Sequence, residues 1–444
     1  MSKEDSIIGE GFSQGANLLK GILSWGVIPA HWYYNLMIIT FNVNVFLLFF
    51  IEIGKVGQES IMFLSGMFLT MGVFRGEESK THSWKSWYKK RLIRIYPNLI
   101  IGVFVNLFLL FFLFGEQHDM NTILLSLSGL QSVPINPAFW GIITHYWFFT
   151  LIISCYLIFP FFYYLIKKQF KLMVILSIIL YICFVVFFDT FNSISQYIMY
   201  VGFGHKLNLW WYSLLTPRYF SFFFGMLFGF WIGQNEIKKI NIFQNRQKTK
   251  LILFILITFF FLLHLYLLSF LIPIGTRGFF SPNTFYSKLA KTLTFPAMGI
   301  LLTILILMIF NEKPKVNRIL EIPGKELFEV ILFHSVPLAL NTYIISIIGT
   351  IPKADLWAIS LPMIFITAFL LAYPFYRFGE WVKREKNIHF IILVIGLSFF
   401  IYGVISNLLF FLHITQLKDI FYIILFNTIL IIVVISSSIH LMGI

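Results

Sequence analysis

Charged residues are scarce in this sequence, and acidic residues are the scarcest. Asp, Glu, Lys and Arg make up 12% of the 444 residues, with 19 acidic side chains against 33 Lys and Arg. A soluble domain carries about 25% charged and about 45–50% apolar residues. Here 59% of the residues are apolar and the mean hydropathy is +0.85, which is more apolar surface than a water-soluble fold can cover. The composition therefore excludes a soluble domain and predicts an integral membrane protein.

Cysteine is nearly absent as well. The chain has two, Cys155 and Cys183, and both lie in apolar runs, which predicts small buried hydrophobic side chains. No cluster of Cys and His has the spacing of metal ligands, so we expect no metal. The first 20 residues are polar and no small-residue cleavage site follows them, so we also expect no cleavable signal peptide.

The positive charge is distributed in a way that predicts membrane topology rather than nucleic-acid binding. The net charge is +14, but Lys and Arg gather in short clusters between apolar runs, whereas a nucleic-acid site needs one continuous basic face. The clusters lie at 75–94, 167–171, 238–250, 313–325 and 377–386. All of them fall on the cytoplasmic side if the N-terminus is cytoplasmic. We therefore predict a multi-pass protein of the plasma (inner) membrane in that orientation.

The apolar runs predict an all-α bundle of about twelve transmembrane helices, because a span needs about 20 apolar residues. The predicted spans lie at 21–38, 58–74, 95–114, 142–166, 172–188, 218–234, 251–272, 289–310, 326–349, 357–376, 389–412 and 420–441. The apolar piece 39–56 carries polar residues and is ambiguous: it could be a re-entrant or interfacial segment. The loops at 115–141 and 189–217 are too short for an added soluble domain, so any active site lies in the bundle or at its mouths.

His31 lies in the first predicted span, 11 residues after Lys20. At 1.5 Å per residue this places it roughly 16 Å from the cytoplasmic end, near mid-membrane. A neutral imidazole there can act as a general base. Taken alone, the residue is better explained as a histidine hydrogen-bonded to a neighbouring helix.

Arg91 and Arg94 are three residues apart and therefore share one face of a helix. The segment 83–96 that contains them has the pattern of an interfacial amphipathic helix, and we expect Pro97 to mark a turn into the third span. Two guanidinium groups at a helix start suit a phosphate or diphosphate. The alternative is simple anchoring on the positive side of the membrane, which fits Lys85, Lys89 and Lys90 better than it fits the two arginines.

His334 lies in the ninth predicted span, after Glu326 and Glu329. Glu329 is five positions before His334 and so does not share its helix face. We interpret His334 as a polar contact between helices.

Four segments, in order along the chain, resemble the membrane acyltransferase family three. Lys20 and His31 look like the basic residue and the histidine of the family's first span. VGQESIMFLSGMFL (56–69) is similar to its second span, KKRLIRIYP (89–97) to its arginine-x-x-arginine element, and WFFTLIISCYLIFP (147–160) to its fourth span. Order and spacing make this combination more specific than any one segment.

Two later segments add to the resemblance. PRYFSFFFGMLFGFWIG (217–233) is similar to a glycine-containing span of the family, and LFEVILFHSVPL (327–338) to its histidine-x-proline span. The resemblance covers roughly 15–376. We therefore divide the chain into an acyltransferase core at 1–376, with ten helices, and additional transmembrane helices at 377–444.

The resemblance implies an O-acyltransferase that moves an acyl group, most often acetyl, from cytoplasmic acyl-CoA to a hydroxyl. The acceptor would be a cell-envelope glycan, a lipid-linked sugar or a small molecule. His31 would be the catalytic residue, as general base or as transient acyl carrier. Lys20, Arg91 and Arg94 would bind the phosphate groups of the donor. No metal and no nucleic acid are implied.

The sequence departs from the family pattern at two places. Many members carry acidic residues in the fourth span, where this chain has Ile152, Ile153 and Ser154. If such an acid orients the acceptor in those members, another group does so here, or the acceptor differs. The basic residue before His31 is Lys20 rather than the commoner arginine.

Two alternatives stay open. A transporter or flippase of a lipid-linked sugar also needs many helices and polar groups inside the membrane, but few ionisable residues lie within these spans and no pair of broken helices appears. An accessory subunit with a decayed site would not need to keep both His31 and the arginine pair. Release of free thiol from acyl-CoA distinguishes an acyltransferase from both.

Overall fold

The computed structural model describes residues 14–22, 26, 28, 45–131, 147–186, 217–237, 247–269, 290–311, 324–348 and 353–411. Every regular element within these ranges is a helix, so the all-α prediction is confirmed for the described part. His31, most of the first predicted span and the last predicted span at 420–441 lie outside the described residues.

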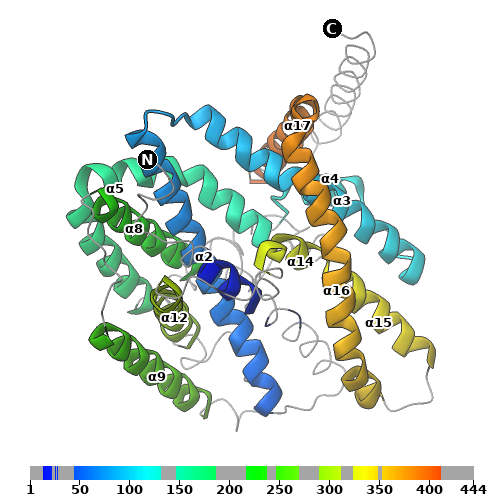
Figure 1. The fold of residues 1–444 in the computed structure, drawn as a ribbon. Coiled ribbons are helices and arrows are strands. Elements are labelled where there is room, and N and C mark those ends of the chain that lie inside the picture. Colours follow the sequence, from blue (N-terminus) through cyan, green and yellow to red (C-terminus); the bar gives the residue numbers. More distant parts are fainter. Residues whose placement is uncertain are drawn as a thin grey trace.

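The described chain forms one bundle with α2 near its centre (Figure 1). Its elements are a helical segment at 14–22, α2 (Val45–Glu78), α3 (Trp84–Phe114), α4 (Met120–Ser128), α5 (Trp147–Val186), α8 (Pro217–Ile237), α9 (Gln247–Ser269), a π-helical turn (Ala290–Thr294), α12 (Phe295–Asn311), α14 (Leu327–Phe333), α15 (Ser335–Ile348), α16 (Lys353–Arg384) and α17 (Lys386–Phe411). Helix α2 packs against α8 and α12, α5 packs against α8, and α3 packs against α15, α16 and α17.

Five of the described helices are long and apolar enough to cross a bilayer. They are Trp84–Phe114, Trp147–Val186, Gln247–Leu267, Thr292–Phe310 and Ile388–Ser406. Large apolar side chains face outward along them, Phe112, Ile179 and Phe254 among others, as lipid-facing positions require. The chain is therefore a multi-pass membrane protein, and the total of about twelve spans stays a prediction.

Helix α5 contains the described parts of two predicted spans, 142–166 and 172–188, without an intervening loop. Its helical geometry breaks at Gln169 (φ −141°, ψ 55°), within the basic cluster predicted to separate them. The predicted boundary between domains, at 376 and 377, falls inside α16.

The piece 39–56, which the sequence left ambiguous, is from Val45 onward the first part of α2. The expectation of a turn at Pro97 is wrong: helix α3 runs through Pro97, so 84–96 and the third span form one helix. A proline removes one backbone hydrogen bond, and a buried position among other helices tolerates that loss; Pro97 is buried.

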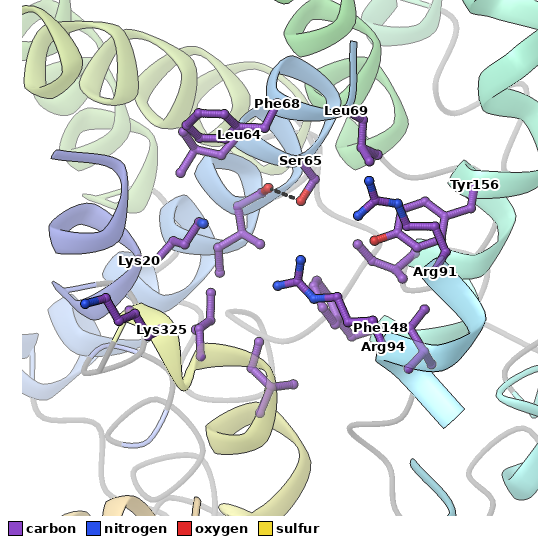
Figure 2. A pocket seen from close by; sticks show the side chains of 16 residues that line it. Lys20, Leu64, Ser65, Phe68, Leu69, Arg91, Arg94, Phe148, Tyr156 and Lys325 are labelled. Carbon is purple, nitrogen blue, oxygen red and sulfur yellow. Dashed lines mark hydrogen bonds between the residues drawn. The ribbon is translucent and has the colours of Figure 1, made fainter. Parts of the chain in front are cut away.

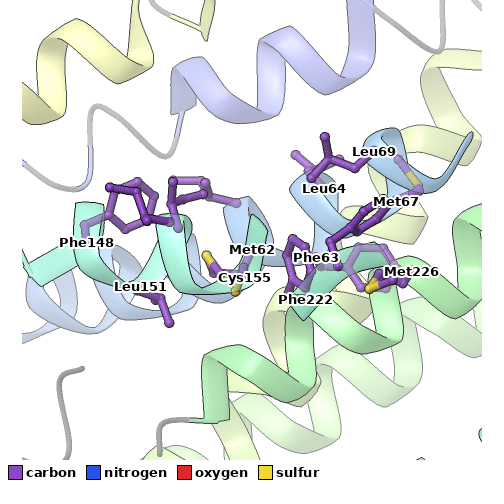
Figure 3. Packing of buried hydrophobic residues seen from close by; sticks show 14 of the residues in the cluster. Met62, Phe63, Leu64, Met67, Leu69, Phe148, Leu151, Cys155, Phe222 and Met226 are labelled. Carbon is purple, nitrogen blue, oxygen red and sulfur yellow. The ribbon is translucent and has the colours of Figure 1, made fainter. Parts of the chain in front are cut away.

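The core lies where α2, α5 and α8 meet, around Phe63, Cys155 and Met226 (Figure 3). Cys155 is fully buried, as predicted, while Cys183 is half-buried. Between α2 and α8 the backbones themselves approach. A Cβ atom on Gly225 would overlap the carbonyl oxygen of Phe63, so this contact depends on glycines spaced four apart, as in membrane helix pairs.

Candidate functional site

A pocket of about 170 Å³ lies between α2, α3 and α5, with the segments 14–22 and 324–331 closing its other side. We call it the cationic pocket. Its lining residues are Lys20, Ile61, Leu64, Ser65, Phe68, Leu69, Arg91, Arg94, Ile95, Phe148, Ile152, Tyr156, Gly324, Lys325, Leu327 and Ile331. Figure 2 shows these side chains converging from five separate stretches of the chain.

Four of the lining residues are cations and none is acidic. Lys20 and Lys325 lie on one side of the pocket, and Arg91 and Arg94 lie on the other (Figure 2). Like charges gathered in a partly buried space repel one another, and this repulsion is relieved by an anion between them. The arrangement therefore fits a ligand with several negative charges.

Stacking against aromatic rings holds Arg91 in place. Its guanidinium lies 5.3 Å from the centre of the Trp87 ring and 5.9 Å from that of Tyr156. Its Nε is buried and has no hydrogen-bond partner among the described residues. Since α3 is helical from Trp84 to Phe114, Arg94 lies one turn further on the same face. The pair presents two planar guanidinium groups, the geometry that suits phosphate oxygens.

Lys20 precedes the first predicted span and reaches the pocket from the helical segment 14–22. Its Nζ lies 5.5 Å from the centre of the Phe68 ring. Burial, together with the positive charge of Arg94, lowers the pKa of Lys20 from 10.5 to about 8. A bound anion would favour the protonated form and raise this pKa again.

The rest of the pocket wall is mostly apolar. Leu64, Phe148 and Ile152 line it, together with Ser65, whose hydroxyl donates to the carbonyl oxygen of Ile61 at 2.8 Å (Figure 2). Ile152 stands in the stretch where many family members carry acids, and here it supplies apolar surface. A ligand for this pocket would therefore combine a polyanionic part with an apolar part.

The structure brings together the three residues predicted to bind the donor, Lys20, Arg91 and Arg94; their roles stay predictions. The sequence interpretation missed Lys325, Tyr156 and Ser65. Lys325 belongs to the basic cluster at 313–325, and membrane topology already explained that cluster. Nothing further in the sequence marked Lys325 as a residue of the site.

Among the polar groups elsewhere, His334 is completely buried. Its Nδ1 donates within its own turn, to Ile331 at 2.9 Å and Val330 at 3.1 Å, and the expected contact with a neighbouring helix stays a prediction. Glu329 joins two helices, because it accepts a hydrogen bond from Asn98 Nδ2 at 2.8 Å. Neither residue lines the cationic pocket.

A second buried polar cluster, which the sequence interpretation also missed, connects α2 with α8. Ser221 donates to Glu59 Oε2 at 2.6 Å, and Arg218 Nε lies 3.9 Å from Glu59 Oε1. Arg218 Nη2 also donates to Gln58 Oε1 at 2.6 Å, and the Arg218 guanidinium lies 4.6 Å from the centre of the Trp147 ring. These groups pair across the two helices, which is the arrangement of an interhelical contact.

Within the described ranges, no three side chains of His, Cys, Asp or Glu are placed to hold a metal ion together. The side chains that converge in the cationic pocket are hydrogen-bond donors to anions. The site is therefore suited to a negatively charged organic ligand.

We compared the chain with known proteins in three ways. Neither the curated proteins nor the solved structures gave a match. The sequence does match the family described as an acyltransferase domain, acyltransferase family three, over residues 14–377. That range contains every residue that lines the cationic pocket. The chain is therefore a membrane acyltransferase and belongs to acyltransferase family three.

Proposed function

We propose that the protein transfers an acyl group, acetyl in the simplest case, from acyl-CoA to a hydroxyl of a cell-envelope glycan, a lipid-linked sugar or a small molecule. The observation that carries this proposal is the convergence of Lys20, Arg91, Arg94 and Lys325 on one pocket with no acidic lining residue. Acyl-CoA joins a diphosphate to an apolar acyl chain, and the pocket offers surfaces for both. In the orientation predicted from the basic clusters, with the N-terminus cytoplasmic in the plasma membrane, this pocket faces the cytoplasmic donor.

The cations hold the donor by its phosphates. Arg91 and Arg94 can each present two N–H groups to phosphate oxygens, while Lys20 and Lys325 supply point charges from the opposite wall. Leu64, Phe148 and Ile152 then lie where a thioester arm would leave the phosphates. The pocket thus orients the donor and leaves the chemistry to a group beyond it.

His31, which lies outside the described residues, is assigned that chemistry through the resemblance to the family. The acceptor oxygen attacks the thioester carbonyl carbon, the C–O bond forms and the C–S bond breaks. The hydroxyl proton passes to His31, which then protonates the departing thiolate. In the covalent variant, the imidazole nitrogen attacks the thioester carbonyl carbon, the C–S bond breaks and the thiol leaves with the imidazole proton. The acceptor oxygen then attacks the acyl-imidazole, the C–N bond breaks and the hydroxyl proton returns to the imidazole.

The test is binding of acetyl-CoA to purified protein in nanodiscs. We expect Arg94→Ala to weaken binding about 10- to 100-fold, since a hydrogen bond to a charged group contributes about 1.5–3 kcal/mol. Lys90→Ala is the matched control, because Lys90 lies on the same helix, is exposed and does not line the pocket. Equal loss in both variants would show that general charge, not the pocket, binds the donor.

His31→Ala tests the chemical step separately. We expect it to abolish the release of free thiol from acetyl-CoA while donor binding stays at the wild-type level. Thiol release that persists in His31→Ala would overturn the assignment of His31. Binding without thiol release by the wild type, with a range of hydroxyl acceptors present, would instead favour a transporter.

A further inference from the structure

A second pocket, of about 390 Å³, lies where α2 ends and α3 begins. We call it the turn pocket. Glu77 lies in the last turn of α2, Lys80 and His82 lie in the turn between the helices, and Trp84 begins α3. Ser83 and, from α5, Lys167 complete the lining. Figure 1 shows α2 and α3 meeting at this turn.

The turn pocket carries unused donors for an anion. Glu77 is already satisfied, since it accepts from Tyr163 at 2.8 Å and from Lys167 at 2.7 Å. Lys80 makes no ion pair with any residue in the described ranges, and His82 Nε2 is buried without a hydrogen-bond partner. The Ser83 side chain does not cap α3, so the first N–H groups of that helix also stay available to a phosphate.

The turn pocket also has an aromatic wall. Trp84 is half-buried and lies edge-on to His82, with ring centres 4.5 Å apart. A flat heteroaromatic ring gains about 1–3 kcal/mol by stacking on such side chains. A cationic, partly aromatic pocket of this size fits a phosphorylated nucleoside better than it fits a simple anion.

A continuous row of aromatic rings connects the two pockets between α3 and α5. The ring centres of Trp84 and Phe159 lie 6.2 Å apart. Phe159 stacks on Trp87 with ring centres 5.1 Å apart, and the ring centres of Trp87 and Tyr156 lie 5.8 Å apart. Trp84 lines the turn pocket and Tyr156 lines the cationic pocket. Trp84 and Arg91 are seven residues apart on α3, so they share a face and are separated by about 10 Å along it.

We propose that the turn pocket binds the adenine and ribose-phosphate end of acyl-CoA while the diphosphate lies in the cationic pocket. Lys80 and His82 contact the 3′-phosphate, and Trp84 contacts the adenine. This inference rests on the proposed function and adds the part of the donor that the cationic pocket does not accommodate. It predicts that the enzyme distinguishes coenzyme A from its form without the 3′-phosphate.

The test compares the binding of acetyl-CoA with that of 3′-dephospho-acetyl-CoA, in nanodiscs of phosphatidylcholine alone so that anionic lipid does not compete. We expect the wild type to prefer acetyl-CoA about 10-fold or more. Lys80→Asn should lower this preference severalfold, mainly by weakening acetyl-CoA binding. Asparagine is chosen because Lys80 has a positive φ of 55°, which asparagine tolerates.

Lys168→Ala is the control, since Lys168 is exposed beside Lys167 and does not line the turn pocket; it should keep the full preference. Equal affinity of the wild type for both thioesters, with both weakened by Arg94→Ala, would overturn the turn-pocket inference and leave the proposed function intact. Failure of the wild type to bind either thioester would overturn both.

Discussion

The two faces of α2 pack in opposite ways. Toward α8 it packs backbone against backbone, through Gly66 on α2 and Gly225 and Gly229 on α8. Toward α3 and α5 its side chains, Leu64, Ser65 and Phe68 among them, line the cationic pocket. In lipid, helices associate mainly through close van der Waals contact and interhelical hydrogen bonds. Close contact on one face therefore supplies stability that allows cations and a cavity on the other.

The largest effect on the difference between the two faces is expected from a side chain placed in the α2–α8 contact. Gly225→Leu would overlap the Phe63 carbonyl and force the helices apart, at a cost of about 3 kcal/mol or more. We expect a large fall in the unfolding temperature in detergent. Gly72→Ala is the control: it lies on α2 with nothing within 4 Å of the added Cβ, and it should keep the wild-type unfolding temperature. Equal destabilisation by both would mean that close contact does not distinguish the two faces.

On the pocket face, Arg91→Lys keeps the charge but removes the planar group that stacks on Trp87 and Tyr156. Because a lysine cannot bind a phosphate in the same two-pronged way, we expect a roughly 10-fold loss of acetyl-CoA affinity, or about 1.4 kcal/mol. The unfolding temperature should hardly change. Wild-type affinity in Arg91→Lys would show that this position contributes charge alone.

The N-terminal cap of α4 lies outside both faces of α2 and shows what a change away from them does to stability and donor binding. Asp119 caps α4, accepting from the Thr122 N–H at 2.9 Å and from the Thr122 hydroxyl at 2.7 Å. Burial alone would raise the pKa of Asp119, but these bonds outweigh burial and hold the pKa below its usual 3.8. The stabilisation is therefore present above about pH 4 and is lost as pH falls through the lowered pKa.

We expect Asp119→Ala to lower stability by about 1 kcal/mol at pH 7 and to leave acetyl-CoA binding unchanged. Asp119→Asn should retain most of the cap, because asparagine also accepts from the backbone, and should lose the dependence on acid pH. Weaker donor binding in Asp119→Ala would mean that the distant α4 is coupled to the pocket.

The finest test concerns Lys20, whose pKa of about 8 lies close to neutrality. As pH rises through this value the pocket loses one positive charge, so acetyl-CoA affinity should fall about threefold between pH 7 and pH 9.5, a modest single-charge effect. Lys20→Arg stays protonated throughout and should flatten this dependence. An identical pH profile in both proteins would assign the titration to another group.

Local pattern was enough to predict the helices and part of the site. The spacing of Arg91 and Arg94 places them on one helix face, and the family motif associates them with Lys20. Lys325 could not be found in this way. Its approach depends on Gly324, where a Cβ would overlap the Asn17 carbonyl, and this tertiary contact leaves no periodic signal. The turn expected at Pro97 was wrong because tertiary packing again decides the outcome. Pro97 is buried among other helices, and this burial outweighs the local preference of proline for a helix break.

The contact between α2 and α8 has a mechanical consequence. Glycine-mediated backbone contact leaves no side-chain rotations to absorb displacement, so α2 and α8 move as one stiff body. Under the proposed function, any expansion of the cationic pocket around a bound donor would therefore fall to the other elements that line it, α3, α5 and the 324–331 segment. Those elements, rather than the α2–α8 pair, would then limit the size of the donor.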